Sequence, residues 1–114
     1  MSDAFGLNKA QRALVREILL TAKDRIEQVA VFGSRAQGRQ RHNSDLDLVL
    51  YGSADEAVCD RLWTLFQESC LPFSVDVQSY ASIKYPPLRA HIDAVARPWF
   101  VRTSQGLEEE KVHS

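Results

Sequence analysis

Two aspartates, Asp45 and Asp47, stand at the start of an apolar run that follows a Gly-Ser turn. Side chains at positions i and i+2 of a strand lie on one face, roughly 7 Å apart along the chain, so both carboxylates can reach a shared point. Held about 4 Å apart, they would repel each other by roughly 4 kcal/mol at an effective dielectric constant near 20. We therefore expect a compensating cation, and oxygen ligands are those that Mg²⁺ prefers.

A third carboxylate, Asp76, lies on the polar face of the later strand pattern Phe73–Ser79. If this strand pairs with the one that carries Asp47, all three acids meet above the same sheet face. Two Mg²⁺ ions about 4 Å apart can activate an attacking hydroxyl and stabilise a leaving group in nucleotidyl transfer. We predict Asp45, Asp47 and Asp76 as the metal-binding and catalytic residues.

The turn Gly33-Ser34 and the arginines that follow it suggest a site for the phosphates of a nucleotide. Gly33 permits close approach of the backbone, and Ser34 offers a hydroxyl and an amide; a helical turn after them would direct further N–H groups at a phosphate. Arg35, Arg39 and Arg41 can meet triphosphate charge. For each arginine the alternative is a solvated side chain, and Arg35 has a second alternative, which is to brace the loop.

The elements that must position these residues are read from hydrophobic periodicity, capping residues and breakers. Two helices are expected to open on capping boxes, one formed by Asn8 with Gln11 and one by Ser53 with Glu56. The predicted order is a helix over 8–25, strands over 28–32 and 45–51, a helix from 53 to about 70, a strand over 73–79, a helix over 88–96 and a short edge strand over 99–102.

The strand pattern separates two faces, because Leu46, Leu48 and Leu50 alternate with the polar positions. Helices are expected to cover the leucine face, and the face with the aspartates is expected to stay open. The predicted fold class is α/β (α+β), a small mixed sheet with helices on one face and the carboxylate site on the other. Residues 1–102 are predicted to form the domain and residues 103–114 a flexible acidic tail.

Composition narrows the class of protein. The chain has 114 residues, enough for one domain, and a formal net charge of −1, which offers no basic field for nucleic acid or anionic lipid. Cys59 and Cys70 have no metal-binding spacing, and no secretory or membrane-spanning segment is visible. We predict reduced thiols and a cytoplasmic location, with neither a membrane nor a nucleic acid as partner.

The motif as a whole resembles the signature of the DNA polymerase β-like nucleotidyltransferase superfamily. Phe-Gly-Ser at 32–34 is followed after ten residues by Asp-Leu-Asp-Leu at 45–48, and "GSRAQG" and "SDLDL" resemble the minimal nucleotidyltransferase branch. The resemblance covers about residues 8–102. It implies that Gly33 and Ser34 hold nucleotide phosphates and that Asp45 and Asp47 hold Mg²⁺. By its place in "SVDVQ", Asp76 matches the later carboxylate that completes the site and helps deprotonate the acceptor.

The resemblance also implies a partner. Minimal members of the superfamily act with a helical HEPN protein (higher eukaryotes and prokaryotes nucleotide-binding), an RNase toxin for which the nucleotidyltransferase is the antitoxin. Some of them transfer AMP from ATP to a tyrosine of the toxin. The implied activity is Mg²⁺-dependent transfer of a nucleoside monophosphate, AMP from ATP or another nucleoside triphosphate, within a homo- or hetero-oligomer.

Three alternatives stay open at this point. The chain could be a non-catalytic binding module that neutralises a HEPN-type partner by covering it. It could modify a small molecule, as aminoglycoside nucleotidyltransferases do, although no acceptor domain is visible. Asp45 and Asp47 could also be ordinary residues, one after a turn and one on a solvated sheet face, in which case neither would bind a metal.

Overall fold

The computed structural model describes residues 4–39, 41 and 44–110. Within these residues, three α-helices and five strands form the fold. Their bounds are α1 (Lys9–Leu20), β1 (Gln28–Phe32), β2 (Leu46–Tyr51), α2 (Glu56–Gln67), β3 (Val75–Ser79), α3 (Pro86–Val95), β4 (Arg97–Thr103) and β5 (Gly106–Glu109). The predicted order of elements is confirmed, with shorter first and second helices and with one additional strand at the end.

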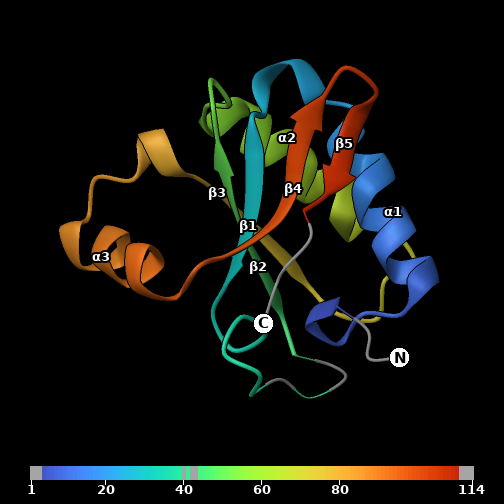
Figure 1. Cartoon of the computed structure of the whole chain (residues 1–114), viewed down its shortest axis with the longest axis horizontal. Coiled ribbons are helices and arrows are strands. Elements are labelled where there is room, and N and C mark those ends of the chain that lie inside the picture. Colours follow the sequence, from blue (N-terminus) through green and yellow to red (C-terminus); the bar gives the residue numbers. More distant parts are fainter. Residues whose placement is uncertain (1–3, 40, 42–43, 111–114) are drawn as a thin grey trace.

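The five strands form one mixed sheet in the order β3-β2-β1-β4-β5. Neighbouring strands run antiparallel except β2 and β3, which run parallel. The parallel pair needs a crossover, which α2 supplies, because two parallel strands cannot be joined by a tight turn. Figure 1 shows the sheet between α1 on one side and α3 on the other. The mixed α/β fold class is confirmed.

Helices α1 and α2 cover the leucine face and form the larger core with Leu46, Leu48 and Leu50. The predicted capping box of α1 is present, with the Gln11 N–H donating to Asn8 Oδ1 at 2.8 Å. The box predicted at Ser53 is not the cap of α2. Asp55 is the N-cap residue and accepts the Val58 N–H at 3.0 Å, since a carboxylate two residues further on competes for that position.

Helix α3 packs on the second sheet face, so the expectation that helices lie on one face only is wrong for this helix. Ile92 of α3 is buried against Ala30, Phe32 and Val49 of β1 and β2. The apolar residues at alternate positions of β1 supply this second, smaller core. The carboxylate face is therefore open at one end and covered at the other.

The prediction of a frayed tail from Thr103 is wrong for residues 103–110. Strand β5 pairs with β4, which thereby lies inside the sheet and not at its edge. The Trp99 indole N–H donates to Glu109 Oε1 at 2.9 Å, and the Gln28 amide donates to Glu110 Oε2 at 2.8 Å. The glutamates of this segment thus bind neighbouring strands of the sheet. Residues 111–114 lie outside the described residues. No described helix has the length and apolar character needed to cross a membrane.

Candidate active site

The centre of the site is a pair of aspartates on neighbouring parallel strands. Asp47 is the second residue of β2 and Asp76 the second residue of β3, and the register of the ladder places them directly opposite each other. Adjacent strands lie about 4.8 Å apart, and opposite residues point to the same face. The structure therefore brings together two acids that are 29 positions apart in the sequence (76 − 47).

Asp45 lies outside this ladder. Strand β2 begins at Leu46, one residue later than predicted, and the Asp45 side chain is exposed. Asp45 nevertheless acts on Asp47, because its charge is one of the causes that raise the pKa of the Asp47 carboxyl. It flanks the pair from the loop side.

Gly33 meets Asp47 at the end of β1. A Cβ atom at position 33 would overlap the Asp47 carboxylate, with the carboxyl carbon only 3.2 Å away, and Gly33 has a φ of +77°. Both the left-handed backbone and the close approach require glycine. The segment after it is a turn, in which the Gln37 N–H donates to the carbonyls of Gly33 at 3.3 Å and Ser34 at 3.2 Å. The Gly-Ser turn and the carboxylates thus form one continuous site.

Arg35 is buried, and the charge of Asp45 acts on its guanidinium. Only 2% of its surface is exposed, and its guanidinium donates to the Ser44 carbonyl at 2.7 and 3.1 Å and to the Phe5 carbonyl at 2.8 Å. It also lies over the Phe73 ring, 4.5 Å from the centroid. A nucleotide contact by Arg35 is therefore not supported, and the alternative that it braces the loop describes its position. The burial of an arginine could not be read from its polar neighbours.

Arg39 and Arg41 are exposed beside the turn. The Arg39 N–H donates to the Ser34 carbonyl at 3.0 Å, and its guanidinium donates to the Gln37 side chain. The Arg41 N–H donates to Ser44 Oγ at 2.7 Å. Both residues lie in the segment that follows the Gly33-Ser34 turn. A nucleotide contact stays a prediction for each of them.

The electrostatics of the site are those of an anionic cluster. Burial, then the charge of Asp76 and then that of Asp45 raise the pKa of Asp47 to about 6. A divalent cation would remove this destabilisation of the ionised form, and the donors are all carboxylate oxygens, the type that Mg²⁺ binds. Within the described part of the chain, no three acidic, histidine or cysteine side chains stand ready as a metal site. The donor set fits Mg²⁺ in chemistry, and its side chains must turn toward the ion on binding.

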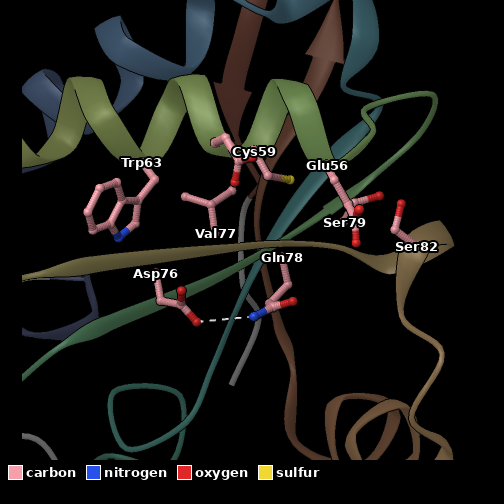
Figure 2. Close-up of a pocket in the computed structure, with 9 residues that line it drawn as sticks. Glu56, Cys59, Trp63, Asp76, Val77, Gln78, Ser79 and Ser82 are labelled. Carbon is pink, nitrogen blue, oxygen red and sulfur yellow. Dashed lines mark hydrogen bonds between the residues drawn. The ribbon is translucent and has the colours of Figure 1, made fainter.

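Sequence reasoning assigned no role to Gln78, two residues after Asp76 on β3. Its amide donates to Asp76 Oδ2 at 3.3 Å (Figure 2). The alternation of side chains along a strand was the signal that could have found it, because it places positions 76 and 78 on one face. Gln78 orients the carboxylate that faces Asp47.

An open carboxylate pair on a mixed sheet, joined to a Gly-Ser turn, defines a nucleotidyltransferase palm. The chain matches the family described as polymerase beta, nucleotidyltransferase over residues 9–102, and it belongs to that family. The comparison with curated protein sequences finds no significant match.

Solved structures share the fold, and three of them come from toxin–antitoxin systems. The first is a crystal structure of a toxin–antitoxin with AMP-PNP: it is 22% identical, has a TM-score of 0.62 and aligns over 75% of this chain and 69% of that one. A mutant of the toxin–antitoxin MntA–HpeT is 22% identical, with a TM-score of 0.63 and coverage of 87% and 76%. A second mutant of that complex is 19% identical, with a TM-score of 0.60 and coverage of 81% and 71%.

Proposed function

We propose that this protein transfers a nucleoside monophosphate, AMP from ATP, to a hydroxyl group of a partner protein. The observation that carries the proposal is the contact geometry of three residues: Gly33 lies against Asp47, and Asp47 lies opposite Asp76. This places a close-approach backbone turn, suited to phosphate, beside two acids on one open face. Membership of the nucleotidyltransferase family supports the same reaction.

The proposed reaction is an in-line displacement at the α-phosphorus. The acceptor oxygen forms a new bond to the α-phosphorus, the bond from that phosphorus to the oxygen leading to the β-phosphate breaks, and pyrophosphate leaves. The proton of the acceptor hydroxyl passes to Asp76, whose exposed side chain can release it to water. Asp47 and Asp45 would hold Mg²⁺, with Asp76 as a further ligand. When bound, the metal supplies positive charge for the phosphates and the leaving group.

The nucleotide phosphates would lie at the Gly33-Ser34 turn. Gly33 leaves room for them beside the carboxylate, and Ser34 is half-buried with a hydroxyl available for hydrogen bonding. Arg39 is exposed next to this turn and is our candidate for the outer phosphates. Arg35 contributes indirectly, since it fixes Ser44 just ahead of Asp45.

We further propose that the partner is a HEPN-type RNase toxin and that the acceptor is one of its tyrosines. Three structures with the same fold are toxin–antitoxin complexes, and one of them contains AMP-PNP, an analogue of ATP. They support a toxin as partner and a nucleotide as substrate. The HEPN identity and the tyrosine come from the resemblance of the Gly-Ser and Asp-Leu-Asp motifs.

Labelled ATP tests the proposal directly. The protein is purified with the partner that co-purifies from a native lysate and is incubated with Mg²⁺ and ATP labelled at the α-phosphate. We expect label on the partner with the native protein and none with Asp45→Asn/Asp47→Asn. Asp24→Asn serves as the control, because Asp24 is exposed and distant in the fold from the carboxylate pair.

Three outcomes would each contradict a different part of the proposal. If both the native protein and the double variant neutralise the partner equally and neither labels it, the protein is a non-catalytic antitoxin that acts by covering its partner. If label appears on a small molecule of the lysate and the partner stays unlabelled, the acceptor assignment is wrong. Equal labelling by the native and double-variant proteins would remove the carboxylates from the mechanism.

A further inference from the structure

A groove runs along the outer edge of β3 and ends at Asp76. It has a volume of about 500 Å³, and its walls are the exposed side of α2 and four consecutive residues of the strand. Consecutive residues of a strand point alternately up and down, so all four can line one groove only along a sheet edge. Figure 2 shows α2 with Glu56 and Trp63 on one side of β3, and Asp76 with Gln78 on the other.

The strand edge in this groove is open. Strand β3 is the first in the sheet order, and no strand among the described residues pairs with its outer side. The Leu46 N–H donates to the Ser74 carbonyl at 2.9 Å, so Ser74 directs its backbone toward β2. Because backbone groups alternate along a strand, those of Asp76 also face β2, while those of Val77 and Ser79 face outward. An extended peptide can pair with such an edge.

A peptide strand paired with this edge would place one of its residues in line with Asp47 and Asp76. Asp47 and Asp76 are opposite each other across β2 and β3, and a residue of an added strand opposite Asp76 would be third in that row. Its side chain would point to the same face, about one strand spacing, 4.8 Å, from Asp76. A hydroxyl-bearing side chain there is presented to the carboxylate that we assigned as proton acceptor.

The α2 wall of the groove is acidic. Glu56 and Asp60 are exposed on it, and none of the described residues that line the groove is Lys or Arg. Burial raises the pKa of the Cys59 thiol to about 11, so this side chain is neutral. Trp63 is 48% exposed and offers an aromatic face to a cation or an aliphatic stem. A second copy of this chain would bring the same acids against each other, so the charge favours a basic occupant.

We propose that the β3 edge groove docks an extended basic segment of the acceptor protein, paired with the outward backbone of β3, and presents its hydroxyl to Asp76. The segment alternates: the acceptor residue faces the carboxylates, and its two neighbours carry positive charges toward α2. The inference rests on the proposed function for the transfer step, whereas the docking itself is independent of catalysis.

Two pentapeptides of identical composition, blocked at both ends, test the alternation. In Thr-Arg-Tyr-Arg-Thr the arginines flank the tyrosine and would face α2, whereas in Arg-Thr-Tyr-Thr-Arg they share its face. With ATP and Mg²⁺ we expect kcat/KM for AMP transfer to be about tenfold higher for the first peptide, the size expected for two partly exposed ion pairs. Asp60→Lys should abolish this preference. Glu17→Lys makes the same charge change on an exposed position of α1 and should retain it.

Backbone amide exchange separates docking from transfer. Without nucleotide, the first peptide should slow exchange of the Val77 and Ser79 amides at least several-fold and leave that of the Asp76 amide, already directed at β2, unchanged. If these outward amides are not protected and the two peptides react equally while ATP still binds, the groove proposal is overturned and the proposed function stands. If protection occurs but no AMP is transferred to any acceptor, the groove stands and the proposed function fails.

Discussion

One face of the sheet has two ends with opposite properties. At one end, Val49 is fully buried beneath Ile92 of α3, and the Tyr51 and Tyr80 rings lie 5.0 Å apart. At the other end, Asp47, two residues before Val49 on the same strand, is half-buried and faces Asp76. The same β2 backbone thus carries a packed contact and a repulsive one within about 7 Å.

This difference shows that the covered end contributes to the stability of the fold, whereas the open end carries the candidate site. Burial of apolar side chains stabilises the covered end, whereas burial and like charge destabilise the ionised form of Asp47 at the open end. An unused acid pair would be a net cost to the fold. Changes at the two ends should therefore have opposite consequences, and the following experiments test this separation.

The largest effect is expected for Asp47→Asn. Loss of this carboxylate should lower the rate of AMP transfer by about three orders of magnitude, equivalent to about 4 kcal/mol, because the variant cannot hold the metal charge at the phosphates. The melting temperature in metal-free buffer should be unchanged or higher, since a repelled, partly buried charge is removed. A strongly destabilised variant would contradict the open position that we assign to this end.

Ile92→Ala should act in the opposite sense. The side chain is fully buried in the smaller core, and its truncation should lower the free energy of unfolding by about 3 kcal/mol. Denaturant titration measures this loss. Transfer by the folded fraction at low temperature should fall far less than in Asp47→Asn; an equal loss of activity would show that the two ends are coupled.

Gly33→Ala and Gly38→Ala form a matched pair at the boundary of the open end. Their φ values are +77° and +71°, so the left-handed backbone costs each variant a similar amount, about 1–2 kcal/mol. A new Cβ has open space at Gly38, whereas at Gly33 it overlaps the Asp47 carboxylate. We expect Gly33→Ala to lose activity as well as stability and Gly38→Ala to lose stability alone. Equal rates of AMP transfer by the two variants would show that the close approach of Gly33 to Asp47 is not needed for activity.

The smallest effect concerns pH. The pKa of Asp47 in the folded chain is about 6, above its usual value near 4, so the folded state binds this proton more tightly than the unfolded state. The stabilisation that the native protein gains by binding this proton is fully present below pH 4 and is lost as the pH rises through 6. In metal-free buffer, the melting temperature of Asp47→Asn minus that of the native protein should increase between pH 4 and 6. A constant difference would argue against the shifted pKa.

The sequence allowed the open end to be predicted better than the covered end. Gly33, Ser34 and Asp47 belong to a short motif whose chemistry constrains residue type, and Asp76 followed from strand alternation together with an assumed pairing. The covering position of α3 depends on apolar residues that fit either face, so periodicity alone could not place it. Strand β5 was missed because its Glu-rich sequence has low β-propensity, and pairing with β4 overrides that preference.

The parallel pairing of β2 with β3 has a consequence for biosynthesis. The two carboxylates come together only after the chain has crossed over through α2, so no short fragment and no early hairpin contains the site. Contacts of such long sequence separation form late, after local elements have appeared. A nascent chain that has not yet exposed β3 therefore cannot bring Asp47 and Asp76 together, and the candidate site forms only when β3 joins β2.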